Sequence, residues 1–133
     1  MSSQKMLTRN QFLVLDVLKE GEKPLSAYDI LDRLRGEGLR APLQIYRALS
    51  ALIGRGHAHR LESLNAFVAC AGKECHKSGL AAFAICEACG QANEFSDFVL
   101  RQRLEGWAER EGFRTSHSVV EMHGTCGACV IRS

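Results

Sequence analysis

The sequence has no apolar run long enough to cross a membrane, which takes about 20 consecutive apolar residues. Its start, MSSQKMLTRNQF, also lacks the apolar core of an export signal. Phosphate-binding loops and a nucleophile with its activating base are absent too, as are low-complexity segments. We therefore expect a cytoplasmic protein that is not an enzyme.

Cysteine is missing from the first 69 residues, and all six cysteines of the chain follow. In a reducing cytoplasm, paired cysteines are more often metal ligands or redox centres than structural disulfides. The two halves differ less in charge than in cysteine content. Residues 1–65 hold ten Lys or Arg and seven Asp or Glu, and residues 66–133 hold seven Lys or Arg and eight Asp or Glu. Charge alone therefore does not indicate nucleic acid, whereas the cysteine distribution predicts two differently built halves.

The first half has the pattern of three helices and a hairpin. Residues 8–21, 24–38 and 41–56 have helical periodicity, and residues 57–70 contain two short alternating runs. In the first helix Thr8 and Gln11 have the spacing of a capping box, and Phe12 falls on the apolar stripe. This order of elements predicts a winged helix-turn-helix.

The third helix is the candidate reader of DNA. Its periodicity buries Ile45 and Leu49, turns Arg47 outward and leaves Tyr46 near the border. Arg40 before the helix, Arg47 on it and Arg60 after it can contact phosphates, and Arg47 can also reach a base edge. The alternative is an ordinary solvated helical face.

The second half reads as strand, strand, helix and strand, with the helix over residues 98–112 and its apolar side formed partly by Val99, Leu104 and Trp107. A unit of about fifty residues needs a metal or a partner chain to stay folded. The predicted class is therefore α+β. We expect a DNA-binding winged helix over residues 1–70, a hinge over 71–79, and an α/β dimerisation and metal-binding domain over 80–133.

Two Cys-x-x-Cys pairs carry the strongest chemical signal. Cys86 and Cys89, with Cys126 and Cys129, can close a tetrahedral four-thiolate shell, which makes such a zinc site structural. The alternative is redox chemistry, but thioredoxin-like pairs begin a helix, whereas these pairs follow predicted strands.

Several further ligand types remain outside these pairs. His59 lies on the first hairpin strand, Cys70 ends the second, His76 is in the hinge and Glu94 follows the first Cys pair. A metal bound by all four would tie the reading domain to the second domain, as an allosteric metal should. His117 and, less so, His123 are candidates for a third site.

The segments IYRALSALIGRGHAHRLES, ICEACGQANEF and HSVVEMHGTCGAC resemble the ferric uptake regulator (Fur) family, and most of all its zinc-uptake-regulator (Zur) branch. The resemblance runs from about Leu7 to Val130. It implies a homodimeric, metal-dependent repressor that binds a double-stranded, palindromic DNA operator. The family's usual Pro-x-Thr-Val-Tyr-Arg is Pro42-Leu-Gln-Ile-Tyr-Arg here, which bears on operator sequence and affinity.

The resemblance also assigns residues. It implies structural zinc on the four paired cysteines and DNA contacts from Tyr46 and Arg47. It further implies a regulatory Zn2+ on His59, Cys70 and Glu94, with His76 or the neighbouring Cys75 completing the shell; we choose His76.

Zinc is the expected signal for two reasons. The His-rich run of iron-sensing members is missing before Cys86, and a thiolate such as Cys70 suits zinc better than iron or manganese. The expected function is repression of zinc-uptake genes by a dimer with one structural and one regulatory zinc per chain. The rivals are an iron- or peroxide-sensing relative and, in a different class, a thiol oxidoreductase or zinc-trafficking protein.

Overall fold

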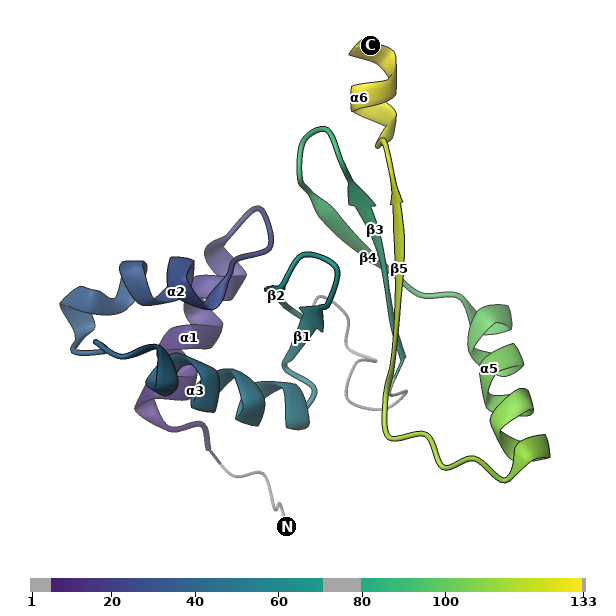
Figure 1. Cartoon of the computed structure of the whole chain (residues 1–133), viewed down its shortest axis with the longest axis horizontal. Coiled ribbons are helices and arrows are strands. Elements are labelled where there is room, and N and C mark those ends of the chain that lie inside the picture. Colours follow the sequence, from purple (N-terminus) through teal and green to yellow (C-terminus); the bar gives the residue numbers. More distant parts are fainter. Residues whose placement is uncertain (1–5, 71–79, 133) are drawn as a thin grey trace. The chain divides into compact units, whose positions relative to one another are not determined.

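The computed structural model describes residues 6–70 and 80–132, so His76 and Cys75 lie outside the described residues. The chain divides into two compact units, Met1–Cys70 and Ala71–Ser133. Each unit is a separate fold (Figure 1). No helix among the described residues has the length and apolar character needed to cross a membrane.

The first unit has three α-helices, a short 3-10 helix and a hairpin. In order they are α1 (Arg9–Glu20), α2 (Ala27–Leu34), η1 (Arg35–Glu37), α3 (Pro42–Gly54), β1 (Ala58–Leu61) and β2 (Ala66–Ala69). The strands pair antiparallel with Ala58 opposite Ala69, and Leu25 adds an isolated bridge to Phe67. This is the predicted winged helix-turn-helix (Figure 1).

Local sequence explains where the first two helices start. The Thr8 hydroxyl accepts a hydrogen bond from the Gln11 backbone N–H, and Gln11 accepts one from Thr8 in return. Ser26 and Asp29 form the same reciprocal box at α2. Each box satisfies two of the backbone N–H groups that a helix start leaves unpaired. The expected capping at Thr8 is confirmed.

The core of this unit lies between the three helices and the hairpin. Its fully buried members include Val14, Ile30, Ile45 and Leu52, each 0% exposed. Phe12 is 61% exposed, so its prediction as part of the buried stripe is wrong. Helical periodicity placed Phe12 on the apolar stripe, but periodicity alone does not decide whether packing covers a given residue of that stripe.

We expect Ile45→Ala to destabilise the first unit by about 2–5 kcal/mol, because it leaves a cavity where a fully buried side chain packs. Amide hydrogen exchange of α3 in the intact chain should show a matching loss of protection. Ser50→Ala on the exposed face of the same helix is the control, with an expected change within about 0.5 kcal/mol. Equal effects of the two substitutions would contradict this packing.

The second unit is a three-stranded sheet with two helices. Its elements are β3 (Leu80–Cys86), β4 (Ala92–Phe95), α5 (Phe98–Glu111), β5 (Ser118–Gly124) and α6 (Gly127–Arg132). The strand order is β4-β3-β5, with β4 antiparallel and β5 parallel to the central β3. The predicted α+β class and the order strand, strand, helix, strand are confirmed, and α6 is an element that the sequence did not predict.

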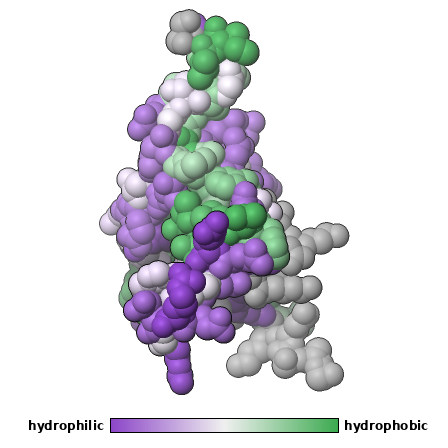
Figure 2. All heavy atoms as spheres, turned by 90° about the vertical axis from the view of Figure 1, so that its right-hand side faces the viewer, coloured by the Kyte–Doolittle hydropathy of each residue, from purple (hydrophilic) through white to green (hydrophobic). Residues whose placement is uncertain are grey.

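The apolar side of α5 is largely uncovered. Val99, Leu104 and Trp107 are 58%, 40% and 52% exposed, and Ala108 is the only buried residue of the helix. Figure 2 views the molecule from the right-hand side of Figure 1. It shows hydrophobic surface on that face and again at the C-terminal end. Helical periodicity identified the apolar side of α5 but not whether this chain covers it.

Candidate metal centres and nucleic-acid interface

The four paired cysteines gather at one end of the sheet in the second unit. Cys86 is the last residue of β3, and Cys89 follows in the turn to β4. Cys126 comes two residues after β5, and Cys129 lies within α6. Parallel pairing of β3 with β5 sets Cys86 opposite Gly124, so the two pairs leave the sheet side by side although about forty residues separate them.

The spacing of the four sulfurs suits a tetrahedral metal. All four Sγ atoms lie within 4.8 Å of one another, and those of Cys89 and Cys126 are 3.9 Å apart. Four sulfurs bound to zinc at about 2.3 Å would be about 3.8 Å from one another. The donor set therefore fits Zn2+, with four soft ligands and no open position for a substrate.

Backbone N–H groups already favour the thiolate form at one member. The Cys126 N–H donates to Cys86 Sγ at 3.3 Å and the Cys89 N–H at 3.4 Å, and together they lower the pKa of Cys86 to about 6. Cys129 behaves oppositely: its hydrogen bonds to the sulfurs of Cys126 and then Cys86 raise its pKa to about 12. A metal that takes all four sulfurs must displace protons, so its binding releases them.

The geometry also bears on the redox alternative. The first pair follows a strand as expected, but Cys126 directly precedes α6, so the expectation that neither pair begins a helix is wrong for the second. Position relative to a helix therefore does not separate the two readings. The clustering of all four sulfurs does, because a redox motif uses one isolated pair.

The first unit holds two of the residues expected at the regulatory site. His59 lies on β1 and Cys70 directly follows β2, where its N–H donates to the carbonyl oxygen of His57 at 2.8 Å. Their ligand atoms lie within 4.8 Å of each other. Glu94 lies on β4 of the second unit, and His76 is outside the described residues.

Cys70 is disulfide-bonded in this structure, whereas the four paired cysteines are free. Zinc binds cysteine as a thiolate. Cys70 can therefore serve as a zinc ligand only after reduction.

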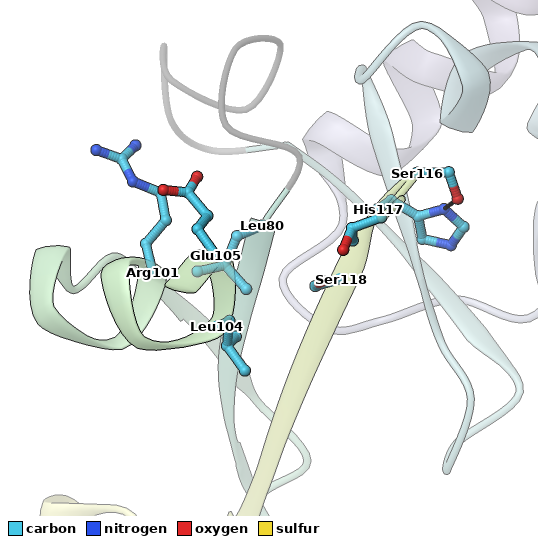
Figure 3. A pocket seen from close by; sticks show the side chains of 8 residues that line it. Leu80, Arg101, Leu104, Glu105, Ser116, His117 and Ser118 are labelled. Atoms are coloured by element: carbon cyan, nitrogen blue, oxygen red, sulfur yellow. Dashed lines mark hydrogen bonds between the residues drawn. The ribbon is translucent and has the colours of Figure 1, made fainter. Parts of the chain in front are cut away.

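His117 does not gather a third ligand set. It directly precedes β5 and lines a small pocket together with Arg101 and Glu105 of α5, and its ring points away from that helix (Figure 3). Its Nδ1 lies 3.3 Å from the Ser116 hydroxyl. His123 lies 3.5 Å from Glu121. Among residues 6–70 and 80–132, neither histidine belongs to a group of three or more possible ligands.

The outward face of α3 is the candidate DNA surface. Tyr46 is 40% exposed, and Arg47 and Ser50 are exposed beside it, one and four residues further along the helix. Arg40 is exposed just before the helix starts. Tyr46 and Arg47 are thus adjacent exposed residues of α3, the element that occupies the position of the helix a winged helix-turn-helix inserts into the major groove, and Arg40 is exposed shortly before it.

Arg60 is placed differently, because its side chain supports the turn of the hairpin. Its guanidinium donates to Asn65 Oδ1 at 3.0 Å and lies 3.8 Å from a Glu62 carboxylate oxygen. Asn65 has a positive φ of 49°, which Asn tolerates better than most residues. A guanidinium has five N–H donors, so Arg60 can hold this turn and still offer a donor to a phosphate.

Gln44 and Leu43 are functional candidates that the sequence did not indicate. Ala41 has no side chain to cap α3, and Gln44 takes this role: its Oε1 accepts the N–H groups of Arg40 at 2.9 Å and Ala41 at 3.1 Å. Leu43 beside it is 57% exposed. The one available signal was at Gln44, which stands where the family usually has threonine; Leu43 occupies a position that the family pattern leaves open.

Comparison with known proteins agrees with this geometry. The ferric uptake regulator family matches residues 3–123. The zinc uptake regulation proteins of Escherichia coli and Shigella flexneri are each 36% identical over 127 residues, covering 93% of this chain and 72% of the relative.

Solved structures give the same picture. A zinc uptake regulator complexed with zinc and DNA superposes with a TM-score of 0.85 at 34% identity, covering 96% of this chain and 85% of that one. Holo XcZur superposes with a TM-score of 0.82 at 37% identity, covering 94% and 86%. The chain therefore belongs to the ferric uptake regulator family.

Proposed function

We propose that this protein is a zinc-responsive transcriptional repressor of zinc-uptake genes, which binds palindromic DNA operators as a zinc-loaded homodimer. The observation that carries the proposal is the exposed pair Tyr46 and Arg47 on α3, in a chain that matches a zinc uptake regulator complexed with zinc and DNA over 96% of its length. Iron- and peroxide-sensing relatives are disfavoured because the well-matched curated relatives are zinc regulators.

The proposed division of labour uses two zinc ions per chain. The four-cysteine zinc holds the second unit together permanently, since metal binding and folding share one free energy there. The second zinc is held by His59, Cys70 and Glu94, with His76 as the fourth ligand. It fills only when free zinc rises.

The regulatory zinc would act by selecting one arrangement of the two units. A metal shifts a conformational equilibrium only as far as it binds one state better than the other. At free zinc about 100-fold above its Kd, a site present in one state alone favours that state by about 2.7 kcal/mol. That is a change of about 100-fold in the ratio of the state competent to bind DNA to the other state.

The dimer would be built on the second unit. Val119 and Met122 on β5 and Trp107 on α5 are exposed apolar residues of this unit, and contact with a second copy would remove apolar surface of this kind from water. Two winged helices held by this dimer would reach successive major grooves, about one helical turn or a multiple apart.

The test is a gel shift on a zinc-uptake promoter with the reduced protein. We expect binding when zinc is added and loss of binding when a chelator removes the looser zinc. Cys70→Ala should lose the response because its sulfur no longer completes the regulatory site. The unreduced protein should behave like Cys70→Ala, since a disulfide sulfur is not a thiolate ligand.

Zinc content provides the control. The reduced protein should hold two zinc ions per chain and Cys70→Ala should hold one. Binding that survives both chelation and the Cys70 substitution would contradict zinc sensing at this site.

A further inference from the structure

The first turn of α3 exposes an apolar side chain where a recognition helix meets the bases. Leu43 is the second residue of the helix and is 57% exposed, whereas Ile45, Ala48 and Leu49 on the opposite side are buried. Leu43, Tyr46, Arg47 and Ser50 follow i, i+3, i+4 and i+7, so they form one outward stripe. In winged and other helix-turn-helix proteins, the N-terminal residues of this helix contact base edges.

Gln44, the polar neighbour of Leu43, already uses its side-chain oxygen to cap α3. Glutamine reads adenine by using its carbonyl oxygen and its amide group together. The Oε1 atom of Gln44 already accepts the N–H groups of Arg40 and Ala41. Releasing that oxygen would uncap the helix, so Gln44 is a poor base reader and Leu43 is the side chain left to face the groove at this turn.

The major groove offers an isolated leucine one apolar feature, the C5-methyl group of thymine. We propose that Leu43 is a specificity-determining residue that packs on a thymine methyl in each half-site of the operator. This inference rests on the proposed DNA-binding function. Burying one methyl-sized group is worth about 0.8 kcal/mol, or about fourfold in affinity for each half-site.

The experiment replaces thymine by deoxyuridine, which removes the methyl group and leaves the Watson–Crick edge unchanged. A duplex is first selected from a random DNA library by the zinc-loaded wild-type protein. Each thymine of the two half-sites is then replaced in turn, and Kd is measured for the wild type, Leu43→Ala and Leu43→Met. One symmetric pair of replacements should weaken the wild type by about 4-fold per half-site, or about 15-fold together.

The variants test whether the effect of the thymine methyl group depends on the side chain at position 43. Leu43→Ala should bind the thymine and deoxyuridine duplexes equally at that position, while Leu43→Met should keep most of the discrimination because it retains apolar length. Leu43 is exposed, so circular dichroism and zinc content should be unchanged in both variants. Gln44→Ala is a further control: it should lower the stability of α3 without removing the preference for the methyl group.

Two results would overturn the proposal. Either no thymine shows a methyl effect that depends on residue 43, or Leu43→Ala loses affinity equally for both duplexes. Failure of the wild type to select any duplex would instead overturn the proposed function itself. The two failures are therefore distinguishable.

Discussion

Replacing Cys126 with serine is expected to unfold the second unit, the largest effect on stability that we expect of any single substitution. Among residues 80–132 the buried apolar residues are few: Ala81, Ala82, Phe83, Ile85, Cys86 and Ala108. A core of six residues, three of them alanine, offsets little of the conformational entropy of some fifty residues. Structural zinc contributes about 10–16 kcal/mol in small zinc-dependent folds, more than this core can replace.

Cys126 also holds the cluster together through its backbone. Its N–H is the first of the groups that lower the pKa of Cys86, and its sulfur lies 3.9 Å from that of Cys89. Serine keeps the backbone and the size of the residue but removes the soft ligand. The expected readouts are loss of the tightly bound zinc and loss of amide protection over β3 and β5.

Cys70→Ser is the matched control. It removes a cysteine outside the four-cysteine cluster and should leave the second unit folded with its zinc in place. A Cys126→Ser protein that kept both its tight zinc and its strand protection would show that the cluster is not the metal centre holding this unit together. Equal damage from both substitutions would point to a general effect of losing cysteine.

Much of the fold could be predicted because its causes are local. The capping boxes at Thr8 and Ser26 depend on side chains three residues away, which the sequence shows directly. The cap of α3 could not be predicted in this way. Ala41 carries no capping group, and Gln44 reaches back to supply one.

A candidate site could be predicted from the sequence where the spacing of its residues is characteristic of one kind of site. Two Cys-x-x-Cys pairs indicated a four-sulfur site, and the parallel pairing of β3 with β5 explains how distant pairs come together. Whether an apolar face is buried or exposed was harder to predict. Periodicity gives Phe12 and Trp107 a place on an apolar stripe, but only the packing of other elements decides which of these side chains is buried, and both are more than half exposed.

Arg47→Ala should reduce operator affinity more than any other single change on the α3 surface. A bidentate contact of arginine with guanine is worth about 1–3 kcal/mol, and a dimer makes it in both half-sites. The expected loss is therefore about 2–6 kcal/mol, or roughly 30-fold at the least. Arg47 is exposed, so zinc content and α3 protection should not change.

Arg103→Ala on the exposed side of α5 is the charge-matched control. It removes one positive charge from the second unit, and its affinity for the operator should stay within about twofold of the wild type, since an exposed charge that makes no contact with DNA is screened by salt. A comparable loss in both variants would mean that net charge, and not the α3 face, governs binding.

Arg47→Lys separates base reading from phosphate contact. Lysine keeps the charge but lacks the planar fork that bonds two atoms of a guanine edge. If Arg47 reads a base, Arg47→Lys should bind random-sequence DNA nearly as well as the wild type while losing preference for the operator. If Arg47 contacts only phosphate, the lysine variant should keep that preference, and Arg47→Ala should lower the salt dependence of binding by about one counterion per half-site. The ratio of operator to random-sequence affinity, measured at two salt concentrations, therefore assigns the role of this side chain.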